Sequence, residues 1–474
     1  MQIQGKIKEN SKWVLLFLIG LLTIKFGLAD YDYYWQARCG KYILTEGNFN
    51  SLTTLSWYNK DLGTYLDHEW LTNIIFYLFS LLGLKGIFFL KTFIISVVMF
   101  TSIKFIKHYN KDLNDVSYLL TVATVFLTSM LVFKVKAYTL SVVFLMYEIR
   151  LLEEYKKKID ENKKIYSILI RLLILIVLWN NMHSGSFPLF FGVAGLYYIT
   201  ELRDKKTLLI GLGSLVATGV TPFGYKLIFF DILHNGNKVM KHLVKDWQAF
   251  DTKESQGIIA FGVLLILFIC MIKTVDKKLF YYVLTFVLLF LTFQSLRQLI
   301  YVYPLVLYFI AKADISKVDI NINKVSVVAS IIMLIGIVYI SISTLNAKDY
   351  EEEYCIRRIP TELQKIIEEQ GYQGLFTSDD GLLAYDGQPF MSGAYPLNSD
   401  KTITTCFLNS YANQTYIENI ISNYGLTKFL IYKYNIENIP DMKYYTLLYD
   451  YLQSHNDKYE CLYDSDIYCY YIER

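Results

Sequence analysis

Charged residues, proline and cysteine are all scarce in this chain of 474 residues, and each shortage argues against a class of protein or site. Charged residues make up only 19% and hydrophobic residues 54%, a balance that is unusual for a soluble protein of this length. The net charge of +3 is too small to indicate a nucleic-acid partner. The 7 prolines form no proline-rich linker, and the 6 cysteines show no C-x-x-C spacing of the kind that binds zinc.

The chain instead contains repeated apolar runs of about 16–20 residues, the length that crosses a hydrocarbon core about 30 Å thick. The first run follows Lys6, Lys8 and Lys12 but lacks a small-x-small cleavage site, so we expect a retained helix rather than a signal peptide. We expect the shorter run at about 68–82 to lie along the membrane surface or to dip into it. These runs predict an all-α polytopic membrane protein with about 11 transmembrane helices, at 13–29, 86–106, 117–133, 137–152, 165–181, 185–200, 207–220, 257–273, 278–294, 299–311 and 325–343.

The distribution of lysines predicts how these helices are oriented, because cytoplasmic loops are enriched in Lys and Arg. With the N-terminus in the cytoplasm, the inner loops hold the basic clusters at 104–111, 156–164, 203–206, 273–278 and 312–324. Counting 68–82 as a full span would invert the orientation of all later helices and place the basic cluster at 156–164 outside. We therefore predict a multi-pass protein with its N-terminus inside and its C-terminus outside.

The apolar runs shorten after residue 346, which predicts a second domain. Pro360 precedes the amphipathic run TELQKIIEEQ and Gly371 follows it, an arrangement typical of a helix. The segments QGLFTS, LTKFLIYKY and KYECLYDSDIYCYYIE predict strands by their aromatic and β-branched content. We expect a transmembrane domain over 1–346, with a first outer loop at 30–70, and an extracytoplasmic α/β domain over 347–474. Cys461 and Cys469 flank a predicted hairpin, where we favour free thiols over a disulfide.

Polar side chains gather in the segments that this topology places outside. Acids near a bilayer are costly unless they face water, a partner or a ligand, and here Asp30 and Asp32 directly follow the first apolar run. Carboxylates suit general-base catalysis on a hydroxyl, and an arginine can bind two oxygens of a phosphate. The candidate substrate-binding residues on this face are Asp67, His68, Glu69, Trp70, His183, Asp246, Trp247, Arg297 and Gln298. Together they predict a reaction between a lipid-linked phosphate donor and a polar acceptor, although each acid taken alone could be a solvated loop residue.

Six stretches follow one another between about 30 and 310, namely DYDYYWQARCGKYILTEGNF, DHEWLTNIIFYLFSLLGLKGI, LWNNMHSGSFPL, TPFGYKL, KDWQAFD and SLRQLIYVYPL. In this order they resemble bacterial multi-pass glycosyltransferases of the GT-C superfamily, which take sugars from polyprenyl-phosphate donors. The resemblance implies surface-lying helices in the first outer loop and a place in the bacterial plasma membrane. It also implies a lipid-linked sugar donor, membrane lipid and a glycan, lipid or protein acceptor as partners.

The resemblance further implies roles for individual residues. Asp30 or Asp32 would be the catalytic base or, as an alternative, would bind a divalent cation such as Mg²⁺ or Mn²⁺. The cluster Asp67–Glu69 would shape the donor or acceptor site, and Arg297 would bind the donor phosphate. The leading prediction is a glycosyltransferase that inverts the configuration at the sugar's anomeric carbon.

Two other functions stay open. A transporter or flippase for a lipid-linked saccharide would carry polar groups near the bilayer midplane. The helix interiors are expected to be almost free of charge, with Arg171 as the main exception, which favours the enzyme. A non-catalytic component of envelope polymer assembly would instead use the outer domain as a docking surface.

Overall fold

The computed structural model describes residues 2–25, 31–49, 66–202, 205–229, 249, 251–315, 322–346, 359–377, 390–391, 414–433 and 443–474. The chain divides into two compact units. Unit 1 comprises Met1–Asp30, Phe79–Ile228 and Gln248–Cys355, and unit 2 comprises Tyr31–Leu78, Phe229–Trp247 and Ile356–Arg474. The boundary between domains that the sequence predicts at 346 stays a prediction.

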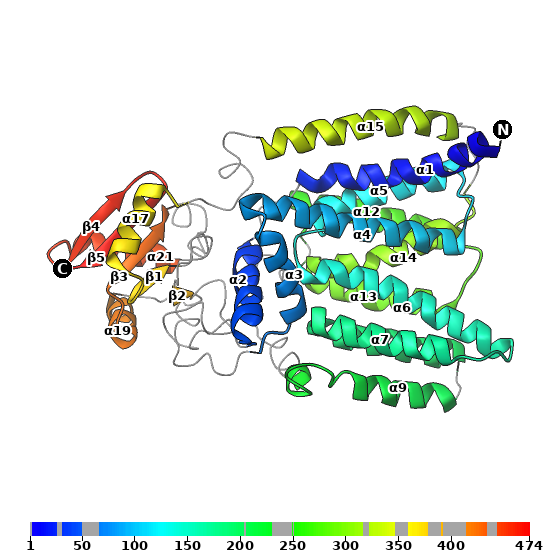
Figure 1. Cartoon of the computed structure of the whole chain (residues 1–474), viewed down its shortest axis with the longest axis horizontal. Helices are drawn as coiled ribbons and strands as arrows, with labels where there is room; N and C mark the ends of the chain where they lie inside the picture. Colours follow the sequence, from blue (N-terminus) through cyan, green and yellow to red (C-terminus); the bar gives the residue numbers. More distant parts are fainter. Residues whose placement is uncertain are drawn as a thin grey trace. The chain divides into compact units, whose positions relative to one another are not determined.

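Unit 1 is a bundle of helices that run side by side (Figure 1). Each of the 11 predicted apolar ranges overlaps one of the helices described in this unit. They are α1 (Gln2–Leu22), α4 (Gly86–Tyr109), α5 (Asp115–Leu131), α6 (Ala137–Asp160), α7 (Tyr166–Met182), α8 (Phe187–Tyr197), α9 (Lys205–Ala217), α12 (Ser255–Lys273), α13 (Leu279–Gln294), α14 (Leu299–Lys312) and α15 (Ile322–Leu345).

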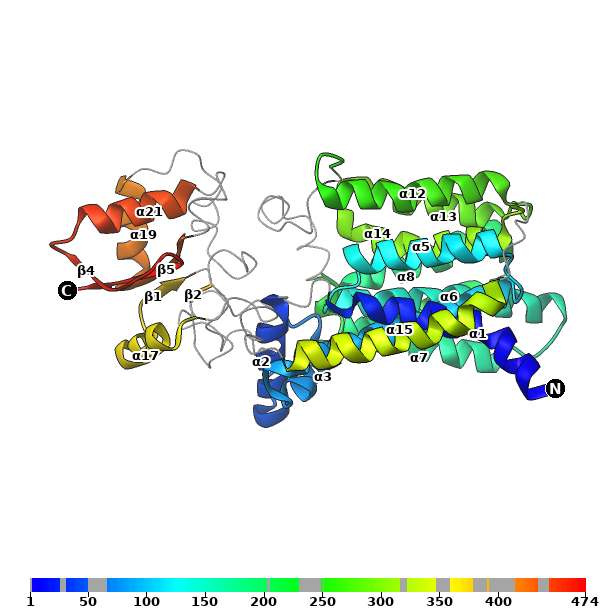
Figure 2. The ribbon, with the colours of Figure 1, turned by 90° about the horizontal axis from the view of Figure 1, so that it is seen from above.

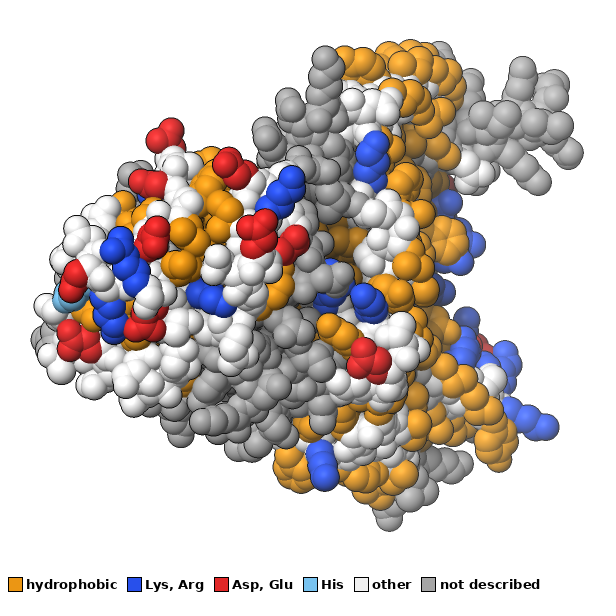
Figure 3. Space-filling model, turned by 60° about the vertical axis from the view of Figure 1, so that its left-hand side comes forward, with side chains coloured by type: hydrophobic (Ala, Val, Ile, Leu, Met, Phe, Trp, Pro, Cys, Tyr) orange, Lys and Arg blue, Asp and Glu red, His pale blue; other side chains and the backbone are white. Residues whose placement is uncertain are grey.

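The centre of the bundle is α14, whose residues from Leu299 to Ala311 are all buried. It packs against α4, α5, α6, α12 and α13, and a helix that is apolar on every side is suited to such a central place. At the periphery, α15 packs mainly on α1 and exposes large apolar side chains such as Ile331 and Ile335. Figure 3 shows a broad orange band of hydrophobic side chains with blue Lys and Arg side chains along its right-hand margin.

Three of the described helices are long and apolar enough to cross a membrane, judged by length and composition. They are Gly86–Tyr109, Ser255–Lys273 and the apolar part of α15, Ser326–Leu345. Others, including Asp115–Leu131 and Leu279–Gln294, are apolar but shorter. The protein is thus mostly helical and compatible with a place in a membrane, while the count of 11 spans and the orientation stay predictions.

The C-terminal part of unit 2 is a five-stranded mixed sheet in the order β2-β1-β3-β5-β4. β1 pairs in parallel with β2 and β3, whereas β5 is antiparallel to β3 and β4. Figure 2 shows α17 on one side of the sheet and α19 and α21 on the other. The elements are α17 (Thr361–Gln370), β1 (Leu375–Thr377), β2 (Phe390–Met391), α19 (Gln414–Tyr424), β3 (Lys428–Tyr432), α21 (Lys443–Ser454), β4 (Tyr459–Asp464) and β5 (Tyr468–Glu473).

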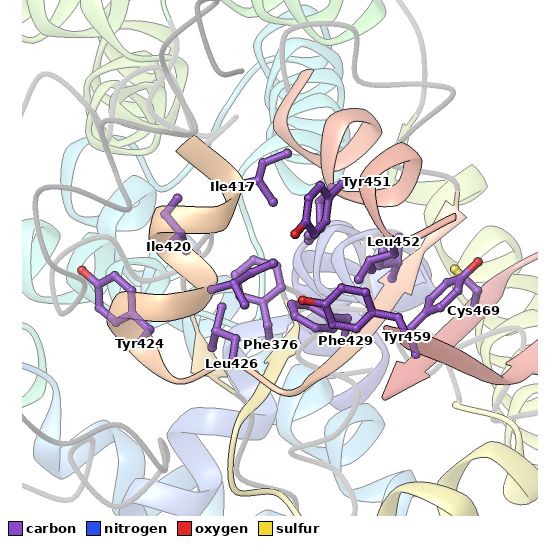
Figure 4. Packing of buried hydrophobic residues seen from close by; sticks show 14 residues of the cluster. Phe376, Ile417, Ile420, Tyr424, Leu426, Phe429, Tyr451, Leu452, Tyr459 and Cys469 are labelled. Atoms are coloured by element: carbon purple, nitrogen blue, oxygen red, sulfur yellow. The ribbon is translucent and has the colours of Figure 1, made fainter. Parts of the chain in front are cut away.

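Each face of this sheet has an apolar core. Leu363 and Ile367 of α17 pack with Leu375, Leu430 and Tyr470 on one face. On the other face α19 and α21 cover the sheet with a larger cluster, which includes Phe376, Ile417, Leu426, Phe429, Leu452, Tyr459 and Cys469 (Figure 4). The predicted helix over TELQKIIEEQ and the predicted strands in the three aromatic segments are confirmed.

The hairpin formed by β4 and β5 decides the state of its two cysteines. Cys461 lies opposite Tyr471, and Cys469 lies opposite Asp464. The two thiols are therefore not cross-strand partners, and both are free. This agrees with the expectation of free thiols for this pair.

Candidate functional site

Two short helices of unit 2 come from the first predicted outer loop. They are α2 (Tyr31–Glu46) and α3 (Trp70–Ser80). They approach each other closely at Gly40, where an added Cβ would lie 2.0 Å from the carbonyl oxygen of Asn73. The ring of Tyr33 on α2 also packs against that of Phe76 on α3, with centroids 6.1 Å apart. This contact brings two stretches that are separate in sequence, DYDYYWQ and DHEW, into one place.

Hydrogen bonds join the two stretches. The Nε2 of Gln36 on α2 donates to Oε2 of Glu69, just before the start of α3. The Nε2 of His68 lies 3.8 Å from Oε1 of the same carboxylate. One carboxylate oxygen of Glu69 therefore accepts a hydrogen bond from Gln36 of α2, and the other lies next to the imidazole of His68. These two neighbours orient the Glu69 carboxylate.

Asp67 anchors the start of α3. Its side chain is completely buried and accepts hydrogen bonds from Nδ2 of Asn73 at 2.9 and 2.8 Å and from the backbone N–H of Glu69 at 3.2 Å. Accepting a backbone N–H at a helix start is what short acidic side chains do well. Asp67 thus positions Glu69 and Asn73 rather than presenting its own carboxylate to solvent.

Two buried acceptors of this cluster are not used by the described residues. The Oε1 of Gln36 and the Oδ1 of Asn73 have no hydrogen-bond partner there, although each residue is almost completely buried. Most buried polar atoms in proteins are hydrogen-bonded, so these two acceptors require an explanation, such as a bound water or another donor.

Burial raises the pKa of Asp67 from 3.8 to about 7, against the opposing effect of its hydrogen bonds from Asn73 and from the Glu69 backbone. Desolvation disfavours the charged form of a carboxyl group, which is the physical cause. Near neutral pH, Asp67 therefore exists as a mixture of its protonated and ionised forms.

This pKa predicts that the α2–α3 pair loses stability as pH rises. Below about pH 4 both folded and unfolded forms are protonated, and the stabilisation is complete. Between about pH 4 and 7 only the folded form keeps the proton, so stability falls by about 1.4 kcal/mol per pH unit and then levels off. Hydrogen-exchange protection of α3, corrected for intrinsic rates, should show this fall in the wild type. Asp67→Asn, which stays neutral, should abolish it, and an equal fall in the variant would contradict the assignment.

The structure places the predicted catalytic residues only in part. Asp32 lies in the first turn of α2, four residues before Gln36 and so on the same face of the helix. Asp30, Asp246 and Trp247 lie outside the described residues. Trp70 is the first residue of α3, where its ring packs edge-on against Phe49 with centroids 5.5 Å apart.

His183 belongs to a separate cluster in unit 1. It follows α7, and its Nδ1 lies 2.6 Å from Oγ of Ser186 and 2.9 Å from Oγ of Ser141. The indole N–H of Trp179 donates to Oγ of Ser141 at 2.9 Å. The hydroxyl oxygen of Tyr301 on α14 lies 3.4 Å from Oγ of Ser186. These contacts tie α6, α7 and α14 together, so His183 has a clear structural role.

Arg297 and Gln298 belong to the 3₁₀ turn Leu296–Gln298, which leads into α14 in unit 1. Of the residues predicted to bind substrate, the structure thus brings together Asp67, His68 and Glu69. Gln36 and Asn73 were missed as members of this cluster. For Gln36 the signal was its spacing of four from Asp32, which puts both on one helical face.

The described residues contain no group of three or more His, Cys, Asp and Glu side chains arranged to hold a metal ion. The expectation of a divalent cation at Asp30 and Asp32 is not tested by this, because Asp30 and the side chain of Asp32 are not described.

No family model matches the chain, and no curated protein matches it in sequence. What defines the molecule is therefore its fold and site: a mostly helical protein with three candidate membrane spans, a small C-terminal sheet and a polar cluster where α2 meets α3.

Proposed function

We propose that this protein is a membrane glycosyltransferase that moves a sugar from a polyprenyl-phosphate donor to a glycan, lipid or protein acceptor. The observation that carries the proposal is the junction of α2 and α3. There Gln36 of α2 bonds Glu69, so that α2 and the acidic stretch DHEW, which are more than 30 residues apart, share one polar cluster. A sugar-binding site uses carboxylates, amide oxygens and aromatic rings. The α2–α3 junction offers Glu69, the amide oxygens of Gln36 and Asn73, and the neighbouring Trp70.

In the proposed reaction an acceptor hydroxyl attacks the anomeric carbon of the donor sugar. Asp32 or Asp30 takes the proton of that hydroxyl, the bond from the anomeric carbon to the phosphate oxygen breaks, and polyprenyl phosphate leaves as an anion. The resemblance to GT-C enzymes implies Arg297, a residue of unit 1, as the partner of that anion, because a guanidinium pairs with two phosphate oxygens. Glu69 and Gln36 hold the hydroxyls of the sugar.

The test is a transfer assay with the full chain in lipid nanodiscs. Polyprenyl-phosphate hexoses with a labelled sugar are supplied together with a lipid or glycan acceptor. The proposal expects labelled acceptor and free polyprenyl phosphate in equal amounts. Intact donor after prolonged incubation with each hexose, under conditions where donor binding is detected, would contradict it.

A second function, transport of a lipid-linked saccharide, is favoured by a different observation. The expectation that Arg171 is the main charge within the helices is wrong: Lys91 on α4 and Glu148 on α6 are both buried inside unit 1. Arg171 instead lies at the surface and pairs with Glu154. Transporters carry ionisable side chains in the membrane interior, and movement of intact donor across a vesicle membrane, without cleavage, would select this alternative.

The proposed orientation makes a prediction about Cys461, whose thiol is exposed on the C-terminal sheet. If the C-terminus is outside the membrane, a membrane-impermeant maleimide added to intact spheroplasts should modify Cys461, as mapped by mass spectrometry. Cys469, which is completely buried, is the internal control and should stay unmodified until the protein is denatured. Modification of Cys461 only after the membrane is permeabilised would place the domain inside.

A further inference from the structure

The interior of unit 1 holds a carboxyl group that the proposed reaction does not use. Glu148 lies midway along α6 and is completely buried. Neither of its carboxyl oxygens has a hydrogen-bond partner among the described residues. Buried side chains of this kind are rarely left without partners, so the chemical state of this group requires a specific explanation.

The neighbours of Glu148 on its own helix are neutral. Residues seven apart lie on one stripe of a helix, which places Ser141 and Tyr155 above and below Glu148. Ser141 accepts the indole N–H of Trp179 on α7, and Tyr155 accepts a hydrogen bond from Thr207 on α9 at 3.3 Å. Glu148 therefore lies on the side of α6 that faces α7 and α9. Arg150, two residues later, lies on the opposite side of the helix.

The helices α4, α7, α8 and α14 pack against α6, and α9 contacts it through Thr207. Most of the described basic side chains on these helices are engaged elsewhere. Arg171 of α7 pairs with Glu154 at 2.8 Å, and Lys312 of α14 pairs with Asp276 at 3.8 Å. On α4, His108 lies 3.1 Å from Glu153, and the ammonium groups of Lys104 and Lys107 lie over aromatic rings. The remaining lysine of α4, Lys91, is buried but forms no ion pair with Glu148. α8 carries no charged residue.

An ionised carboxylate in this place would be isolated in a low-dielectric interior. Removing an ion from water without a partner costs several kcal/mol even after the protein relaxes, and such a group takes up a proton instead. We propose that Glu148 is a proton-binding site in the interior of unit 1, occupied at neutral pH. The ligand is a single proton, held as a neutral carboxylic acid and released as H⁺ when water or a cation reaches the carboxylate. Ionisable side chains inside membrane helices commonly serve such relays.

Infrared spectroscopy of the full chain in lipid nanodiscs tests this directly. The spectrum of the wild type minus that of Glu148→Gln should contain the carbonyl-stretch band of a protonated carboxyl at pH 7, and the band should persist at about pH 8. Glu154→Gln is the matched control on the same helix, because Glu154 is paired with Arg171 and its removal should cost only carboxylate bands. Carboxylate bands in the Glu148 difference spectrum at pH 7 would overturn the proposal.

Two further variants keep the test decisive. If Glu148→Gln does not fold, Glu148→Asp should shift the protonated-carboxyl band, and an unshifted band would exclude Glu148 as its source. A neutral carboxyl should also tolerate a neutral replacement of similar length, so Glu148→Met should keep the wild-type yield and melting temperature to within a few degrees. A large loss in both Gln and Met variants, together with an absent band, would show that the native group is ionised. The infrared bands, the yield and the melting temperature can all be measured whether or not the protein transfers sugar.

Discussion

In the proposed sugar transfer, at least one of the variants Asp32→Asn and Asp30→Asn is expected to be about 10²–10⁴-fold slower than the wild type, the usual cost of removing a general base. Asparagine keeps the size of aspartate but cannot take the proton of the acceptor hydroxyl. Asp32 is the more informative position, because it belongs to the first turn of α2, four residues before Gln36, the residue that bonds Glu69. The measurement is the initial rate of transfer to a saturating acceptor.

A matched control lies on the same helix. Glu46, the last residue of α2, is exposed, and Glu46→Gln removes one carboxylate from α2 without touching the cluster. Its rate should stay within about twofold of the wild type, because a solvated surface acid takes no part in the reaction. Wild-type turnover by both aspartate variants would remove Asp30 and Asp32 from the mechanism.

Glu69→Gln separates binding from chemistry. Glu69 accepts a hydrogen bond from Gln36 and is assigned to the sugar hydroxyls, so its loss should raise KM more than it lowers kcat. The Asp32→Asn variant should instead lower kcat more than it raises KM. A purely structural role for Glu69 would lower the amount of folded protein and leave KM unchanged.

The helices of unit 1 could be located from the sequence because long apolar runs leave few alternatives. The helix α2 had no such signal, because its residues mix aromatic, charged and small side chains, so only the resemblance to GT-C enzymes led us to expect a helix in this part of the first outer loop. In the C-terminal domain, α19 and α21 were not predicted. The sequence of α21, KYYTLLYDYLQS, is rich in aromatic residues that favour strands, and its helical state reflects packing of Leu448 and Leu452 on the sheet.

The candidate site shows the same limit. Two acidic stretches were identified as a pair from their chemistry, but nothing in the sequence indicated which residues would bond them. The contact of Gln36 with Glu69 depends on how α2 crosses α3, and the burial of Asp67 depends on Asn73 reaching back six residues to its carboxylate. Buried ionisable residues were missed for a related reason: Lys91 and Glu148 lie within apolar runs, where a hydropathy average hides single residues.

Gly40→Ala is expected to separate α2 from α3 and thereby to disrupt the whole cluster. An alanine Cβ at this position would lie 2.0 Å from the Asn73 carbonyl oxygen and 2.9 Å from Cβ of Tyr77. The first of these is a backbone atom of a helix, so the clash cannot be relieved by a rotamer change and the helices must move apart. Overpacking of this kind costs about 1–3 kcal/mol or more. Hydrogen-exchange protection of both α2 and α3 should fall in this variant.

The effect on function follows from the geometry of the Gln36–Glu69 contact, which lies one turn along α2 from Gly40. If α2 and α3 separate, this hydrogen bond is lost and the transfer rate should fall together with protection. Gly192→Ala on α8 is the matched control, since nothing lies within 4 Å of the added Cβ. There the usual preference of helices for alanine should leave stability unchanged or raise it by up to about 1 kcal/mol. Equal protection of α2 and α3 in Gly40→Ala and the wild type would show that the close approach at Gly40 does not hold this site together.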